Sequence, residues 1–107
     1  MNNFFRTGID LGGTKIESIV LDSSGSQVFR KRIPSPQGSY TDTVNAITEL
    51  VLESDNHVHE ITKVGIGIPG ALSEPTGLVK NANSTWLIGK PLKSDLEYSL
   101  KRRIKIE

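Results

Sequence analysis

The chain has 107 residues, enough for one small domain, and its 36% hydrophobic and 23% charged residues are an ordinary balance for a packed core. Its net charge of +1 argues against a nucleic-acid partner, because that role needs a concentrated basic surface. It has no cysteine, which excludes disulfides, and its first twenty residues hold no apolar run that could serve as a signal peptide or a membrane span, so we expect a cytoplasmic protein without a membrane partner.

The first third of the chain predicts three consecutive strands. Residues 4–10, 15–21 and 27–33 have strand character and are separated by a Gly-Gly pair and by an Asp-Ser-Ser-Gly-Ser cluster. In the second run, Ile16 and Val20 lie on the same face of a period-two pattern. The pattern indicates a three-stranded meander.

The remainder of the chain alternates between helix and strand. After Ser39 and Thr41, two candidate caps, apolar residues recur at helical spacing for about three turns, until Asp55 breaks the pattern. Residues 63–68 predict a buried strand packed closely through its glycines. Pro91 suits the first turn of a second helix, with Leu92, Leu96 and Leu100 on one face, and the basic residues that follow it form a solvated end. Ile104 begins a further strand in which the sequence stops, which indicates truncation. The layout is α/β with a mixed sheet.

The strongest chemical signal is the segment Gly-Ile-Asp-Leu-Gly-Gly-Thr-Lys that ends at Lys15. Gly12 and Gly13 allow a sharp turn that brings backbone N–H groups close to an oxyanion, and Thr14 adds a hydroxyl. Asp10, at the end of the strand, could hold Mg²⁺ directly or through water. An ordinary hairpin turn would also explain the Gly-Gly pair, and the residues alone leave that alternative open.

A second glycine-rich segment, residues 65–70, matches the dinucleotide-binding fingerprint Gly-x-Gly-x-x-Gly. That fingerprint needs a helix at its end, whereas Pro69 and Gly70 lead into a further turn-forming stretch. We therefore interpret the segment as a strand that ends in a turn, and not as a nicotinamide site.

Residues 80–86 gather amides, hydroxyls and the only tryptophan of the chain. Asparagine side chains such as Asn83 both donate and accept hydrogen bonds, as sugar hydroxyls require. Trp86 can offer an apolar wall and one N–H. A polar surface loop with Trp86 packed beneath it is an equally good interpretation of these residue types.

Together, three segments resemble the ROK family, which is named for repressors, open reading frames and kinases. Residues 8–15 are similar to its first phosphate motif and residues 65–70 to its second stretch, and residues 77–87 are similar to its bacterial fructokinases. The resemblance implies an actin-like ATPase or ribonuclease H-like fold of two lobes. Residues 1–107 would be the truncated N-terminal lobe, with the C-terminal lobe absent.

The resemblance also implies which residues bind the substrates. Those that contact the ATP phosphates are Asp10, Gly12, Gly13, Thr14 and Lys15, with Asp10 also serving Mg²⁺. Those that form the sugar pocket are Gly70, Ala71 and Asn83. The catalytic base, an Asp of an Asn-Asp-Ala-Asn motif, would follow Glu107, so the isolated fragment is expected to be inactive.

The expected function of the full-length protein is phosphorylation of a hexose by ATP and Mg²⁺, with fructose converted to fructose 6-phosphate by resemblance of the loop around Asn83. Mannose and glucose remain open as acceptors. The resemblance also places a zinc site and a homodimer contact in parts that this chain lacks. Two alternatives are a sugar-responsive transcriptional regulator, for which residues 1–3 leave no room for a helix-turn-helix, and a non-catalytic sugar- or nucleotide-binding module.

Overall fold

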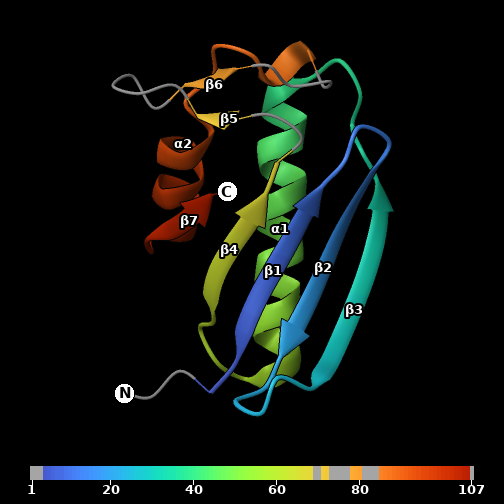
Figure 1. Cartoon of the computed structure of the whole chain (residues 1–107), viewed down its shortest axis with the longest axis vertical. Coiled ribbons are helices and arrows are strands. Elements are labelled where there is room, and N and C mark those ends of the chain that lie inside the picture. Colours follow the sequence, from blue (N-terminus) through green and yellow to red (C-terminus); the bar gives the residue numbers. More distant parts are fainter. Residues whose placement is uncertain (1–3, 69–70, 73–77, 81–84, 107) are drawn as a thin grey trace.

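The computed structural model describes residues 4–68, 71–72, 78–80 and 85–106. Within them, five strands form one mixed sheet in the order β3-β2-β1-β4-β7, and two helices cover one of its faces (Figure 1). The elements are β1 (Arg6–Leu11), β2 (Lys15–Leu21), β3 (Gln27–Pro34), α1 (Tyr40–Val58), β4 (Lys63–Gly67), β5 (Ala71–Leu72), β6 (Val79–Lys80), the 3₁₀ helix η1 (Thr85–Leu87), α2 (Leu92–Leu100) and β7 (Ile104–Ile106).

The strand directions bring the predicted site segments to one end of the sheet. β1, β2 and β3 form the predicted antiparallel meander, whereas β4 pairs parallel to β1 and β7 pairs parallel to β4. The carboxyl ends of β1, β4 and β7 therefore point the same way, toward the upper end of Figure 1. The β1–β2 turn, the start of α1, the β5–β6 pair and η1 also lie there. In α/β sheets this end is where ligands bind.

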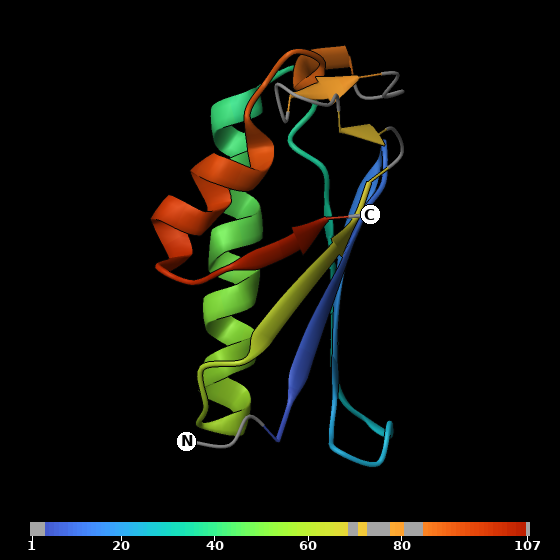
Figure 2. The ribbon, with the colours of Figure 1, turned by 60° about the vertical axis from the view of Figure 1, so that its left-hand side comes forward.

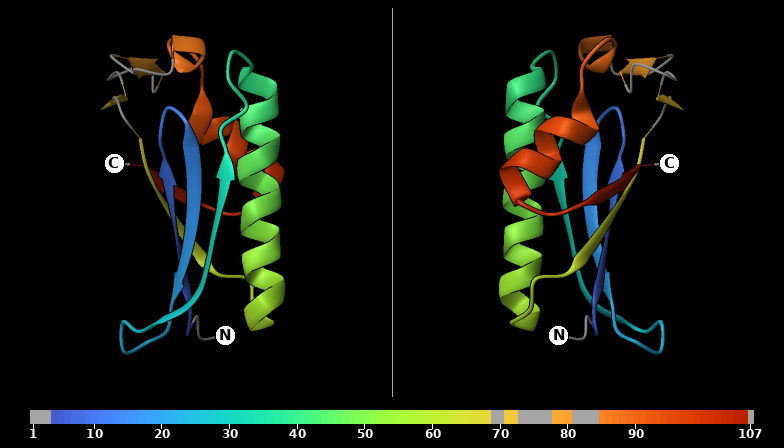
Figure 3. Two further views of the ribbon diagram at one scale, coloured as in Figure 1. Left: turned by 90° about the vertical axis from the view of Figure 1, so that its right-hand side faces the viewer. Right: turned by 90° about the vertical axis from the view of Figure 1, so that its left-hand side faces the viewer.

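The hydrophobic core lies between the sheet and the helices, which Figures 2 and 3 show on the same side of the sheet. The period-two prediction for β2 is confirmed, since Ile16, Ser18 and Val20 are fully buried. The helical prediction for residues 92–100 is also confirmed, because α2 directs its leucines into the core. The core residues from the two helices are Ile47, Leu50, Val51, Leu92, Leu96 and Leu100.

Helix α1 is longer than the sequence predicts. It spans 19 residues and continues through Asp55 to Val58, so the expectation of about three turns is wrong. Ser54 and Asp55 lie on its buried face and have partners there: the Ser54 hydroxyl lies 2.7 Å from that of Ser18 in β2, and the Asp55 carboxylate accepts the backbone N–H of Thr62 at 3.0 Å. Polar residues that are satisfied by neighbouring elements do not interrupt a helix.

A buried ion pair fastens the far end of α1 to the α2–β7 turn. Arg102 Nη2 lies 2.6 Å from Asp55 Oδ2, and Arg102 Nη1 donates to Asp55 Oδ1 and to the carbonyl of Thr62. The Thr62 hydroxyl donates to Asp55 and lies 2.6 Å from the hydroxyl of Thr7 in β1. We call these four residues the Asp55 network. The prediction of a solvated basic end is wrong for Arg102, whose side chain is only 12% exposed.

Strand β4 is buried on one face only. Val64 and Ile66 point into the core, whereas Gly67 is exposed on the opposite face. Among the described residues, a Cβ built on Gly65 or Gly67 would meet no atom closer than 3.9 Å, so the prediction that these two glycines pack the strand closely is wrong. The next element after β4 is the short strand β5 and not a helix, which confirms that residues 65–70 are not a dinucleotide fingerprint.

Candidate functional site

The turn over residues 12–15 connects β1 to β2 at the upper end of the sheet. Leu11 pairs with Ile16, and the Gly12 N–H donates to the Lys15 carbonyl at 2.9 Å, which closes the turn. A Cβ on Gly12 would lie 3.0 Å from that same carbonyl oxygen. Because the obstacle is backbone and not a flexible side chain, a side chain at position 12 would force the turn to shift.

The carbonyl groups of the 12–15 turn are held by the connection between β3 and α1. The Ser35 hydroxyl donates to the Gly12 carbonyl at 2.9 Å, and the Ser35 N–H donates to the Thr14 carbonyl at 2.8 Å. The Gln37 amide donates to the Gly13 carbonyl at 3.3 Å. Within the described part of the chain, the N–H groups of Gly13 and Thr14 donate no hydrogen bond, so they are available to an anion.

Asp10 stands beside this turn on the exposed face of the sheet. It pairs with Glu17 in the antiparallel ladder and with Gly67 in the parallel one. Glu17 is neutralised by Arg30 Nε at 2.6 Å and Arg32 Nη2 at 3.2 Å, and the hydrogen bond from Arg30 is the main cause of its lowered pKa. Among the described residues Asp10 itself has no hydrogen-bond or ion-pair partner. An exposed, unpartnered carboxylate at this position is suited to a hydrated Mg²⁺ ion.

The five residues predicted to contact ATP are therefore adjacent in the structure. Gly12 is half-buried, and the other four, Asp10, Gly13, Thr14 and Lys15, are exposed. The arrangement supplies N–H donors, a hydroxyl, an ammonium group and a carboxylate on one accessible rim. These are the groups that positioning of a phosphoryl group requires.

The structure places only part of the predicted sugar pocket. Gly70 and Asn83 lie outside the described residues. Ala71 belongs to β5 and pairs with Lys80 of β6 at the upper end of the sheet. The assignment of these three residues to a sugar stays a prediction.

Trp86 packs against the core from η1, next to the fully buried Leu87. Its indole Nε1 donates to the Thr43 hydroxyl in the first turn of α1 at 3.2 Å. The one N–H of the side chain is thus used within the lobe. This geometry favours the interpretation of Trp86 as a packing residue beneath the polar segment.

Sequence reasoning did not identify Ser35, Gln37 or Thr43 as part of the site. Their contacts with the turn and with Trp86 depend on how β3 and α1 return beside β1, which no local pattern encodes. The one available signal was the position of Ser35 and Gln37, on either side of Pro36, at the end of a predicted strand. A polar residue beside a proline at a strand end is a frequent turn-binding group.

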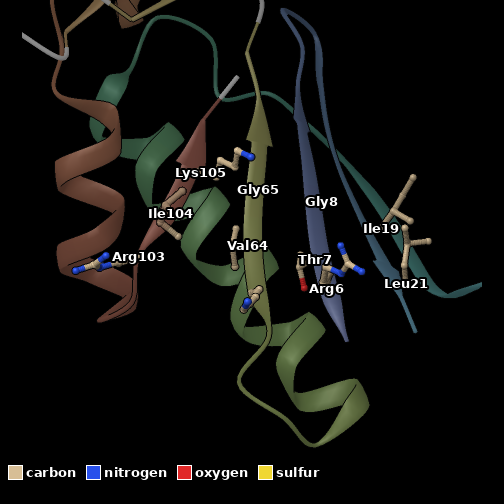
Figure 4. A pocket seen from close by; sticks show the side chains of 11 residues that line it. Arg6, Thr7, Gly8, Ile19, Leu21, Val64, Gly65, Arg103, Ile104 and Lys105 are labelled. Carbon is tan, nitrogen blue, oxygen red and sulfur yellow. The ribbon is translucent and has the colours of Figure 1, made fainter. Parts of the chain in front are cut away.

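A separate hollow of about 770 Å³ lies on the open face of the sheet (Figure 4). It exists because Gly8 and Gly65 have no side chains, while Arg6, Leu21 and Arg103 stand around it. Its lining contains none of the predicted site residues. The hollow is therefore a property of the uncovered face and not of the candidate phosphate site.

None of the helices in the described residues combines the length and the apolar character that a bilayer span needs. In the same part of the chain, no three histidine, aspartate or glutamate side chains come together as a metal-binding group.

Comparisons with known proteins place the chain in a family. The chain matches the ROK family over residues 6–107. It is 40% identical over 99 residues to an N-acetyl-D-glucosamine kinase of Pectobacterium atrosepticum, with 92% of this chain and 33% of that protein covered. The chain thus spans about a third of the length of the curated relatives it matches.

Solved structures show the same fold. A ROK family glucokinase from Streptomyces griseus, in complex with glucose and AMPPNP, superposes with a TM-score of 0.83 and 27% identity, covering 96% of this chain and 32% of that one. A ROK family transcriptional regulator superposes with a TM-score of 0.77 over 95% of this chain and 27% of its own, at 12% identity, which is a likeness of fold alone.

These matches confirm the predicted fold class, an α/β lobe of the actin-like ATPase type with a mixed sheet. The match over residues 6–107 includes the 12–15 turn, the β4 strand and the segment that leads to Trp86. The chain belongs to the ROK family.

Proposed function

We propose that the full-length protein transfers a phosphoryl group from ATP to a hexose, and that residues 1–107 are its N-terminal lobe. The observation that carries the proposal is the 12–15 turn: its carbonyl groups are held by Ser35 and Gln37, while its Gly13 and Thr14 N–H groups have no partner among the described residues. The kinases among the relatives support the same activity.

On the nucleotide side, Gly13 and Thr14 would donate their N–H groups to oxygens of the terminal phosphates. The Thr14 hydroxyl and the Lys15 ammonium group would add donors and positive charge. Asp10 would hold Mg²⁺ directly or through water, and the ion would neutralise charge on the transferring group. Phosphoryl transfer depends mainly on such positioning and charge stabilisation.

On the acceptor side, Gly70, Ala71 and Asn83 would contact the sugar. Fructose is the acceptor predicted from the resemblance of residues 77–87. The curated relatives are named N-acetyl-D-glucosamine kinases, which makes that amino sugar the direct competitor. Phosphorylation rates for fructose, N-acetylglucosamine, glucose and mannose, measured in parallel, would decide between them.

The proton of the sugar hydroxyl would pass to an aspartate that follows β7, and no acid of residues 1–107 takes this role. The 107-residue chain alone should therefore show no turnover. A zinc site, a homodimer and a cytoplasmic location stay predictions for the full-length protein.

The test is the variant Asp10→Ala in the full-length protein. Because Asp10 is exposed and has no partner in the described part of the chain, folding should be unaffected, whereas kcat should fall on the order of a hundredfold or more. Hexose affinity, measured by titration calorimetry, should change little. Undiminished kcat in the variant would contradict the assignment of Asp10.

The same preparation separates the alternatives. A transcriptional regulator shares this fold, so fold alone does not distinguish an enzyme from a regulator. Wild-type protein that binds AMPPNP and hexose without forming a sugar phosphate would be a non-catalytic module. Tight operator binding without turnover would identify a regulator.

A further inference from the structure

The hydroxyl group of Thr43 lies where two supporting segments of the site meet. Thr43 is in the first turn of α1 and is 1% exposed. Its Oγ1 donates to the Ser39 carbonyl at 2.8 Å, with the Pro36 carbonyl at 3.4 Å, and accepts from Trp86 Nε1 at 3.2 Å. A hydroxyl has one proton to donate and lone pairs to accept with, so it can serve both neighbours at once.

The first of these neighbours leads to the phosphate turn. Pro36 and Ser39 belong to the connection that contains Ser35 and Gln37, which bind the three carbonyl groups of residues 12–14. Ser39 is the N-cap of α1 and accepts the Asp42 N–H at 3.1 Å. The position of this connection therefore determines the position and orientation of the 12–15 turn.

The second neighbour leads to the sugar side. Trp86 belongs to η1 and follows Asn83 by three positions in the sequence, and the next residue, Leu87, is fully buried.

The Tyr40 hydroxyl, also in the first turn of α1, donates to Asp95 at 2.5 Å. Burial, followed by this hydrogen bond, raises the pKa of Tyr40, so the phenol stays protonated and can donate at neutral pH.

We propose that Thr43 is a positioning residue that couples the two sides of the site, because its single hydroxyl orders both the connection that holds the 12–15 turn and the η1 segment that carries Trp86. This inference rests on the proposed kinase function for its effect on substrates. It goes beyond that function because Thr43 is buried and is none of the residues assigned to ATP or to the hexose.

The variant Thr43→Val removes the hydroxyl while keeping the branched shape of the side chain. The Ser39 carbonyl retains the Thr43 N–H at 3.1 Å, so the loss falls on the Trp86 contact and on the side-chain bond to the connection. In the full-length protein, KM for ATP and KM for hexose should each rise about three- to tenfold, as expected for one hydrogen bond, with a smaller change in kcat. Thr43→Ser should restore both values.

Two further variants test the nucleotide side and the hexose side of the coupling separately. Ser35→Ala should raise KM for ATP alone, because it loses the bond to the Gly12 carbonyl. Trp86→Phe should raise KM for hexose alone, because it loses the bond from Nε1. The matched control is Thr48→Val, since Thr48 lies in the same helix and bonds the carbonyl four residues earlier, but contacts Ser99 and not Trp86.

Amide hydrogen exchange provides a readout that does not need activity. Thr43→Val should speed exchange of the Gly12 and Ser35 N–H groups, which donate to the Lys15 and Thr14 carbonyls, and exchange in residues 85–90, whereas Thr48→Val should speed neither. If exchange changes in one segment only, or if both KM values match wild type while the wild type is active, the coupling is wrong. If the wild type has no kinase activity, the proposed function fails, and the exchange result still decides the coupling.

Discussion

Two polar clusters in this structure differ in what their hydrogen-bonding groups do. In the Asp55 network both carboxylate oxygens of Asp55 have partners, and the side chains of Asp55 and Arg102 are each 12% exposed. At the 12–15 turn, the N–H groups of Gly13 and Thr14 and the carboxylate of Asp10 are exposed without partners in the described residues. Buried polar groups that satisfy one another stabilise a fold, whereas exposed donors held in fixed positions can bind a ligand.

The largest effect on stability should come from Asp55→Ala. It leaves Arg102 charged and largely buried, at 12% exposed, and removes the acceptor of the Thr62 N–H, so the free energy of unfolding should fall by about 3–5 kcal/mol. Urea unfolding of the full-length protein measures this. The folded fraction should bind AMPPNP with unchanged affinity, because the network is at the opposite end of α1 from the phosphate turn.

The matched control is Lys31→Ala, which removes an ion pair of similar length. Lys31 Nζ lies 2.8 Å from Glu53, but the two side chains are 42% and 47% exposed, so the loss should stay below about 1 kcal/mol. Equal losses for the two variants would mean that burial is not what distinguishes the Asp55 network.

Gly12→Ala should weaken nucleotide binding, whereas Asp55→Ala should lower stability and leave nucleotide binding unchanged. The added Cβ would lie 3.0 Å from the Lys15 carbonyl, so the turn must shift, and AMPPNP affinity should fall about tenfold, equivalent to about 1.4 kcal/mol of binding free energy. Titration calorimetry measures this in the full-length protein. Hexose affinity should be close to that of wild type.

Gly8→Ala is the control for Gly12→Ala. Gly8 lies within β1, four residues before Gly12, and its added Cβ would meet the Ile19 carbonyl only at 3.9 Å, an ordinary contact. A loss of nucleotide affinity as large in Gly8→Ala as in Gly12→Ala would refute the effect assigned to a side chain at position 12.

The smallest effect is expected at Glu17. This residue lies opposite Asp10 in the β1–β2 ladder but, unlike Asp10, forms ion pairs. Arg30 and Arg32 hold its pKa below the ordinary glutamate value, so its contribution to stability is complete above that ordinary value and is lost as the pH falls through the lowered one. Unfolding curves at descending pH should therefore show a steeper loss for wild type than for Glu17→Gln. Identical slopes would show that the ion pairs have no effect, as is common at exposed sites.

Elements whose buried faces are apolar were predictable from sequence. The period of Ile16, Ser18 and Val20 identified β2, and the leucines at 92, 96 and 100 identified α2. The length of α1 and the low exposure of Arg102 were not predictable. Aspartate and arginine usually lie on the surface, and these two lose exposure only by pairing across 47 positions of the chain. Local pattern carries no information about such a pair.

The candidate site likewise has one part that was predictable from the sequence and one part that was not. Asp10 and the Gly12–Lys15 turn are contiguous, so their grouping could be predicted from the sequence alone. Ser35 and Thr43 act through contacts made by the return of β3 and α1, which only the tertiary structure reveals. The predicted roles of Gly70 and Asn83 remain to be tested in solution.

The most direct test of the phosphate turn is the response of its own amide groups. With glycine and threonine labelled for NMR in the full-length protein, addition of MgAMPPNP should shift the Gly13 and Thr14 N–H resonances as they donate to phosphate oxygens, while the resonance of Gly8 stays in place. Saturation of nucleotide binding without movement of the Gly13 and Thr14 resonances would contradict the account.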